Sequence, residues 1–173
     1  MAKNPFNTEE PLAYLITWTT YGTWLPGDER GWKRKGESDL QSPDALAYDA
    51  AQLRMKEPKF RLSRQQRVIV EATIRDHCTI RKWTLHTVNA RSNHVHVVVT
   101  APNYDPEIVR DQFKAWCTRK LREAGYKRDN FWTEKGSCRS INTEDDLESA
   151  VLYVAEAQDR KGREWNPQPL KSQ

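Results

Sequence analysis

The chain has 173 residues, of which 37% are hydrophobic and 30% are charged, a composition typical of a single globular domain with a charged surface. No apolar run approaches the roughly 18 residues needed to cross a bilayer, and residues 1–11 contain no apolar signal core. We therefore expect a cytoplasmic protein with no membrane partner. Three scattered cysteines favour neither a disulfide framework nor a zinc knuckle, and a net charge of +4 favours a polyanionic partner only weakly.

Two contrasting segments open the chain. Leu12 to Thr20 is rich in β-branched and aromatic residues, which predicts a first strand. Residues 21–58 contain several glycines and prolines and a basic cluster, which together predict a long loop or insertion with a short helix within residues 43–56. A loop of this length inside a compact domain is usually functional or poorly ordered.

One helix and two strands follow. Ser63 and Gln66 form a capping box that predicts a helix from Ser63 to about Lys82. Residues 83–90 and 93–101 predict two strands joined by a tight turn, and the valines of the second strand predict that it is central and buried.

Asp105 followed by Pro106 predicts the start of another helix, which ends at Gly125. Its inner stripe is predicted to consist of Val109, Phe113, Trp116 and Cys117. Residues 131–141 predict a short strand or hairpin, residues 143–160 a last helix, and residues 161–173 a loose tail. The element order predicts an α+β fold in one domain spanning residues 1–173, a ferredoxin-like β-α-β-β-α-β sandwich with an added C-terminal helix.

His94 and His96 are separated by one residue on a predicted strand. Because strand side chains alternate, both imidazoles leave the same face, about 7 Å apart along the chain. Two neutral nitrogen ligands at this spacing can meet one divalent ion, whereas a half-exposed strand would leave the same pair bound only to water.

The last predicted helix carries the second group of candidates. Leu147, Val151 and Val154 form its apolar stripe at about 100° per residue, and Tyr153 lies on the flank of that stripe. Gln158 falls near the middle of the stripe, where either a metal or a buried backbone hydrogen bond would satisfy its amide.

The His94-Val95-His96 motif on a valine-rich strand, followed by a helix with Tyr153 and Gln158, resembles the HUH single-tyrosine transposases of bacterial insertion sequences. In particular it resembles the REP-associated tyrosine transposases, those linked to repetitive extragenic palindromes. The resemblance covers residues 12–160 in element order. It implies that His94, His96 and Gln158 hold Mg²⁺ or Mn²⁺, and that Tyr153 cuts single-stranded DNA through a 5′-phosphotyrosine.

This resemblance further implies a DNA hairpin or single-stranded DNA as partner, with the protein acting as a monomer or a homodimer. One departure concerns the third ligand, which the family commonly places four residues after the tyrosine. Here that position is Ala157, and Gln158 comes one residue later, so a π-bulge would be needed to bring it toward Tyr153. Glu156 is the competing ligand, although a regular helix places it on the polar face.

Basic residues of the 21–58 segment and of the 105–125 helix are candidates for DNA binding, although a solvated helix face is the commoner meaning of such charges. They are Arg30, Lys33, Arg34, Lys114, Arg119, Lys120 and Arg122. We expect His86 to be structural and His77 to be a core histidine.

Four other functions compete with a transposase. A domesticated relative would bind DNA hairpins without cutting them. A two-histidine phosphoesterase would need a second matched histidine unit, which the chain lacks. A barrel-type metallohydrolase would need a longer chain. A structural protein with an incidental histidine pair is the remaining alternative.

Overall fold

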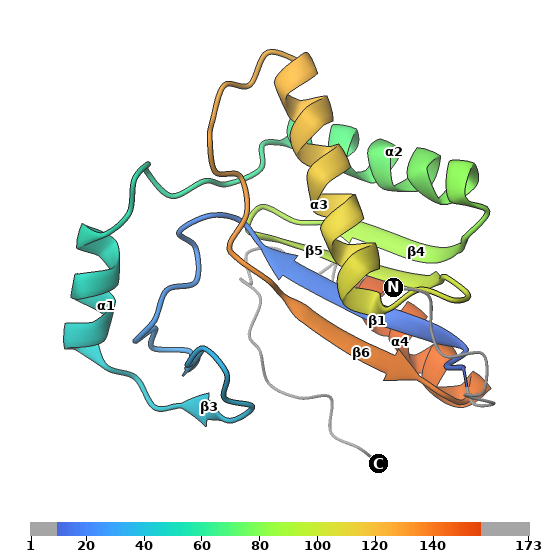
Figure 1. Ribbon diagram of the computed structural model, residues 1–173, viewed down its shortest axis with the longest axis horizontal. Coiled ribbons are helices and arrows are strands. Elements are labelled where there is room, and N and C mark those ends of the chain that lie inside the picture. Colours follow the sequence, from blue (N-terminus) through green and yellow to red (C-terminus); the bar gives the residue numbers. More distant parts are fainter. Residues whose placement is uncertain (1–9, 157–173) are drawn as a thin grey trace.

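The computed structural model describes residues 10–156 and contains a four-stranded sheet with the order β4-β5-β1-β6. Its strands are β1 (Ala13–Thr19), β4 (Thr84–Ala90), β5 (His94–Thr100) and β6 (Ser137–Ile141). All neighbouring strands pair in antiparallel fashion (Figure 1). This order is that of a ferredoxin-like sandwich, so the α+β fold predicted from the element order is confirmed.

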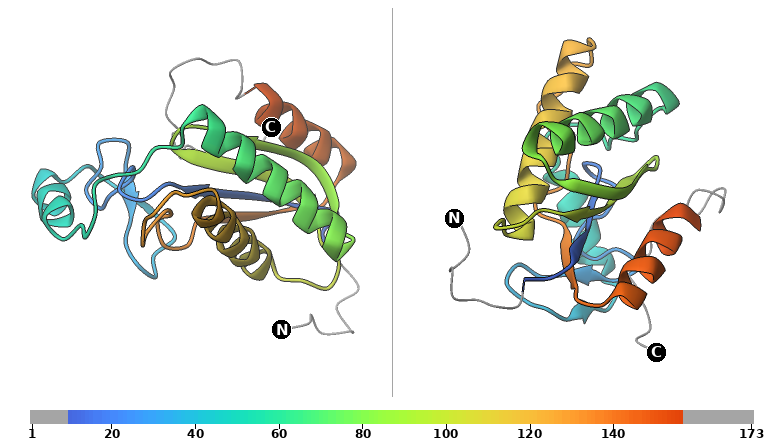
Figure 2. Two further views of the ribbon diagram at one scale, coloured as in Figure 1. Left: turned by 90° about the horizontal axis from the view of Figure 1, so that it is seen from above. Right: turned by 90° about the vertical axis from the view of Figure 1, so that its right-hand side faces the viewer.

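Helices cover both faces of the sheet. Helices α2 (Arg64–Arg81) and α3 (Pro106–Glu123) pack side by side on one face, and α4 (Glu144–Glu156) lies on the other (Figure 2). The larger core lies between the sheet and α2 with α3, while a smaller apolar cluster lies under α4. The site described below lies on the α4 face.

Strand β5 is central and buried, as its valine run predicted. Because side chains alternate along a strand, Val95, Val97 and Val99 enter the core under α2 and α3. Val98 joins the smaller cluster under α4, and His94 and His96 leave the sheet on that same face. The valines therefore anchor the strand from one side while the histidines project from the other.

The predicted ends of α2 and the predicted start of α3 agree with the structure, although the expected cap of α3 does not form a side-chain hydrogen bond. The predicted end of the last helix near residue 160 lies outside the described residues. Both halves of the capping box between Ser63 and Gln66 are formed, and Lys82 closes α2 in the left-handed conformation. Pro106 begins α3 as predicted, but the side chain of Asp105 makes no capping hydrogen bond.

The predicted inner stripe of α3 is wrong at one position. Trp116 is 37% exposed, whereas Arg110 is buried, with its guanidinium hydrogen-bonded to Asp111 and within 3.8 Å of the Cys138 sulfur. The predicted stripe did not include Arg110, and the contact of α3 with β6 buries it.

Residues 21–58 form a folded arm on one side of the sheet (Figure 1). The arm contains the short strands β2 (Trp32–Lys33) and β3 (Leu40–Gln41) and the predicted short helix, α1 (Ala45–Leu53). At its base, the Glu57 carboxylate accepts hydrogen bonds from the backbone of Asp129 and from both the backbone and side chain of Asn130. The arm is therefore tied to the connection between α3 and β6.

Within residues 10–156, no helix is both long enough and apolar enough to span a membrane.

Candidate active site

One rung of the sheet organises the site. His96 on β5 pairs with Thr17 on β1 and with Asn89 on β4. Paired residues of antiparallel strands project from the same face, so all three side chains point toward the α4 side. Thr17, Asn89 and His96 are 4%, 2% and 1% exposed, so these three members of the rung are almost fully buried.

The two histidines face each other across a short gap. Their ring centroids lie 4.6 Å apart with the ring planes at 77°. Nδ1 of His94 donates to Asn93 Oδ1 over 2.7 Å, and Nδ1 of His96 lies 2.8 Å from Thr17 Oγ1. When Nδ1 carries the proton, Nε2 carries the lone pair that can bind a metal. Partners of this kind fix the tautomer and orientation of ligating imidazoles.

Both imidazoles are neutral at physiological pH. Burial, with the positive charges of His96, Arg91 and Arg30 added, lowers the pKa of His94 to about 2. Burial and the charge of Arg91 lower the pKa of His96 to about 4. Because only the neutral ring can ligate, burial keeps both side chains in the form that binds a cation.

Tyr153 lies beside the histidines in the same chain. Its ring centroid is 5.6 Å from that of His96, with the ring planes at 72°. Ala150 and Val154 seat helix α4 on the sheet, and the Asn89 side-chain amide donates to the Val154 carbonyl over 3.0 Å. A single rung therefore carries His96, the Thr17 hydroxyl beside it, and the amide that anchors the tyrosine helix.

The predicted third ligand, Gln158, lies outside the described residues, as does Ala157. Glu156 is described and exposed, in keeping with its expected place on the polar face. Within residues 10–156, no group of three or more His, Cys, Asp or Glu side chains is arranged to hold a metal. The described donors thus amount to a two-imidazole half-site.

The arm brings Arg30 toward this half-site. Asp28 binds its guanidinium, and Nη2 also donates to the Thr23 carbonyl over 2.6 Å. Although burial alone raises the pKa of Asp28, the hydrogen bonds and charge of Arg30 outweigh it and lower that pKa. Lys33 and Arg34 lie further along the arm and are exposed.

The predicted DNA-binding residues of α3 lie across the sheet from the histidines, because α3 covers the opposite face (Figure 2). Lys114 donates to the carbonyls of Thr133 and Lys135, and burial lowers its pKa to about 8. Arg119 and Lys120 pair with Glu123, and Arg122 donates to the carbonyls of residues 128 and 129. The structure thus separates these four cations from the His94–His96 pair.

The other two histidines make local contacts. His77 is buried, lies 2.9 Å from Gln112 Oε1 through Nε2, and packs against aromatic rings that include Trp83 and Phe113. His86 lies 2.8 Å from the Thr100 hydroxyl, between the paired strands. Both therefore have the structural surroundings expected of them.

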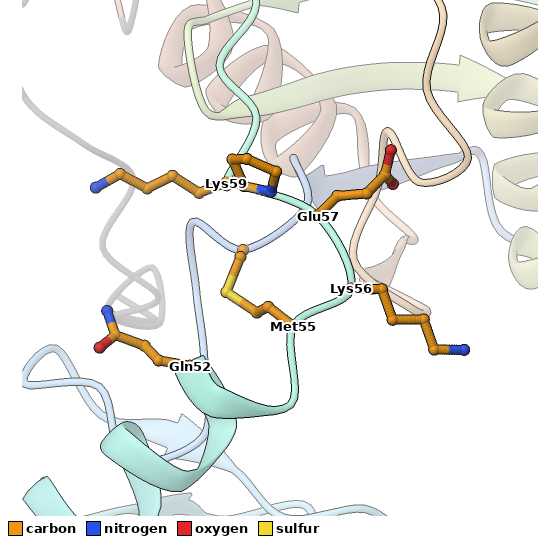
Figure 3. A pocket seen from close by; sticks show the side chains of 7 residues that line it. Gln52, Met55, Lys56, Glu57 and Lys59 are labelled. Carbon is orange, nitrogen blue, oxygen red and sulfur yellow. The ribbon is translucent and has the colours of Figure 1, made fainter.

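An open pocket of about 530 Å³ lies at the base of the arm, away from the histidines. Gly22, Met55 and Glu57 are among its lining residues, and the side chains of Lys56 and Lys59 extend from it in opposite directions (Figure 3). None of the residues that line it belongs to the His94–His96–Tyr153 group.

Comparison with known proteins agrees with the fold. A solved structure of a REP-associated tyrosine transposase bound to a REP hairpin has the same fold, with a TM-score of 0.53 and 12% sequence identity, over 94% of this chain and 75% of that one. The family described as "Transposase IS200 like" matches residues 52–157, more than half of the chain. The chain belongs to the IS200-like transposase family.

A transposase-like protein from Deinococcus radiodurans R1 is also similar, at 15% identity over 89% of this chain and 96% of that one, with a TM-score of 0.45. No curated protein matches this chain.

Sequence reasoning missed the residues that support the site. In the sequence alone, Thr17 and Asn89 are ordinary polar residues of predicted strands, and Arg91 is a residue of a predicted turn. The signal that could have found the first two is strand register, because both pair with His96 once β1 and β4 are aligned with β5. Aligning the strands requires the sheet order, which local sequence patterns do not specify.

We predict that Asn89→Ala loosens the tyrosine helix. The substitution leaves the buried Val154 carbonyl without its amide donor, which should lower the free energy of unfolding by about 1–3 kcal/mol. Urea denaturation measures the loss, and hydrogen exchange should show faster exchange in α4 than in α2. Thr84→Ala, at an exposed position of the same strand, is the control and should change stability by less than about 0.5 kcal/mol. Equal stability of the two variants would contradict the anchoring role of Asn89.

Proposed function

We propose that this protein is a metal-dependent, single-tyrosine HUH transposase that cuts and rejoins single-stranded DNA through a 5′-phosphotyrosine. The observation that carries this proposal is the convergence of His94, His96 and Tyr153 in a chain of the IS200-like transposase family. Neither the histidine pair nor the tyrosine would be informative alone. Together they supply two ligands and a nucleophile within one buried site.

The residues present fit a divalent cation such as Mg²⁺ or Mn²⁺. His94 and His96 would hold it through Nε2, with Gln158 as the third ligand and phosphate oxygens completing the coordination. When bound, the cation would polarise the scissile phosphate and offset the negative charge of the transition state. Asn93 and Thr17 would keep both rings in the ligating tautomer.

Tyr153 would act as the nucleophile. Its hydroxyl oxygen attacks phosphorus, a new oxygen–phosphorus bond forms, and the bond from phosphorus to the 3′ oxygen breaks. The phenol proton leaves, and the departing 3′ oxygen takes up a proton to become a free hydroxyl. In the reverse sense, a 3′-hydroxyl attacks the phosphotyrosine, releases Tyr153 and joins two strands.

The natural partner would be single-stranded DNA or a DNA hairpin, in keeping with the hairpin bound by the structurally similar REP-associated transposase. A net charge of +4 suits that partner. Arg30, Lys33 and Arg34 of the arm are the cations that we place nearest the cut strand. Lys114, Arg119, Lys120 and Arg122 would contact DNA only if it wrapped onto the α3 face. Since the proposed reaction acts on DNA, we place the protein in the cytoplasm.

Incubating the protein with Mn²⁺ and a library of labelled single strands, each with a hairpin and randomised flanks, should give a covalent adduct that survives denaturing electrophoresis. Tyr153→Phe should abolish the adduct because it removes the nucleophile, and mass spectrometry should place the DNA on Tyr153. The control is Tyr126→Phe, a half-buried tyrosine on the α3 side, which should still form the adduct. Hairpin binding with no adduct under any divalent cation would instead identify a DNA-binding protein that does not cut.

The Thr17 hydroxyl should tune the affinity for metal. In Thr17→Val the His96 ring loses its Nδ1 partner at nearly constant volume, so Mn²⁺ affinity should fall about 10–100-fold. Isothermal titration calorimetry measures the affinity without DNA. Thr87→Val, on the neighbouring strand β4, should leave it unchanged. If Thr17→Val binds Mn²⁺ as tightly as the wild type, while His96→Ala does not, the hydroxyl has no supporting role.

The described chain brings its own Tyr153 to its own His96, so we expect cleavage within one protomer. A mixture of the His94→Ala/His96→Ala variant with the Tyr153→Phe variant should then form no adduct, because neither chain holds a complete site. A size tag on one variant shows which chain carries DNA. Recovery of adduct on the histidine-deficient chain would show that the tyrosine helix is exchanged between two copies.

A further inference from the structure

The backbone that carries Arg30 is tightly folded. Gly31 follows it with φ near +88°, and the Gly31 amide donates to the Asp28 carbonyl over 3.0 Å. The Trp24 indole donates to the Gly31 carbonyl over 2.7 Å. Gly27, with φ near +87°, packs so closely on the start of α1 that a side chain there would collide with the backbone of Asp44. The arm thus holds Arg30 at one fixed place.

The guanidinium is fixed as well. Its Nε donates to Asp28 Oδ1 over 2.8 Å, and its Nη2 donates to Asp28 Oδ2 over 2.7 Å. Asp28 is 5% exposed and the Arg30 side chain is 19% exposed, so the pair is mostly shielded from water. A two-pronged contact of this kind sets the plane of the guanidinium and not merely its position.

Hydrogen bonds connect this pair to the histidine site. Nη2 of Arg30 donates to the Thr23 carbonyl, and the Thr23 hydroxyl donates to the Thr20 carbonyl over 2.7 Å and approaches the Asn93 carbonyl at 3.4 Å. Asn93 in turn accepts the hydrogen bond from His94 Nδ1. The path from Arg30 to His94 thus runs through Thr23 and Asn93.

We propose that Arg30 contacts the scissile phosphate at the His94–His96 site, and that Asp28 is the positioning residue that aims its guanidinium. This inference rests on the proposed cleavage reaction. Asp28 and the Thr23 carbonyl hold the Nε and Nη2 side of the guanidinium, and the permanent positive charge fixed in this way would stabilise the phosphorane-like transition state. The family match begins at residue 52, so this contribution comes from a part of the chain that the family model does not cover.

The alternative is that the Asp28–Arg30 pair only holds the arm together. The two roles differ in what happens when the phosphate loses its charged oxygen. If Arg30 stabilises that oxygen, removing it from the DNA makes Arg30 dispensable. If the pair is only structural, the defect of the variant is the same on either substrate.

The experiment uses the oligonucleotide recovered by the wild-type adduct, with either a normal phosphate or a methylphosphonate at the mapped cleavage position. On the phosphate substrate, single-turnover adduct formation should slow about 100-fold or more in Arg30→Ala, with hairpin affinity within about 3-fold of wild type. Arg30→Lys keeps the charge but loses the two-pronged contact with Asp28 and should slow about 10-fold or more, as should Asp28→Asn. On one methylphosphonate stereoisomer, the gap between wild type and Arg30→Ala should shrink to less than about 10-fold.

The matched control is Arg75→Ala, an exposed arginine on α2 paired with Glu71, which should react at the wild-type rate. Thermal unfolding of every variant shows whether the fold is intact. If Arg30→Ala unfolds at a lower temperature than the wild type, the rates of Arg30→Lys and Asp28→Asn on the two substrates test the role of Arg30 instead. A rate within 3-fold of wild type, or an equal defect on phosphate and methylphosphonate, overturns the role of Arg30. Absence of adduct in the wild type overturns the cleavage reaction itself, and this inference with it.

Discussion

The register of β5 between β1 and β4 is the constraint on which the rest of this structure depends. Because strand side chains alternate, the valines that bury β5 under α2 and α3 force the histidines onto the α4 face. A slip of one residue would exchange the two sets, placing imidazoles in the apolar core and valines at the site. The pressure to bury the valines is thus also what positions the histidines.

This arrangement makes stability and site geometry inseparable. The rung through His96 includes Thr17 on one side and Asn89 on the other, and Asn89 reaches the helix that carries Tyr153. Burying polar groups costs free energy unless they are hydrogen-bonded, and each of these side chains has a partner within the fold. The two imidazoles are therefore preorganised before any cation or DNA arrives, and the cost of orienting them is met during folding.

The sequence predicted the features that depend on local periodicity. The helices, the buried central strand, the element order and the shared face of His94 and His96 all follow from residue patterns repeating every two or 3.6 residues. The features that depend on distant contacts were not predictable. Asn89 meets Val154 only because α4 folds back onto β4, and Arg110 is buried only because β6 packs beside α3. Gln158, whose placement depends on the helix continuing past Glu156, remains a prediction.

The arm of residues 21–58 also has features that follow from local sequence and features that depend on distant contacts. Its glycines and prolines predicted a long loop or insertion with a short helix within residues 43–56, and α1 lies within those bounds. They could not show that the arm fixes the Arg30 guanidinium. The Asp28–Arg30 pair is connected to the histidine site through hydrogen bonds of Thr23 and Asn93, which are distant in the sequence. Asn93 is the last turn residue before β5, so it borders the sheet register and also takes part in the arm contact. A change in that turn would therefore disturb His94 and Arg30 together, which makes the turn the junction between the family core and the part of the chain outside the family match.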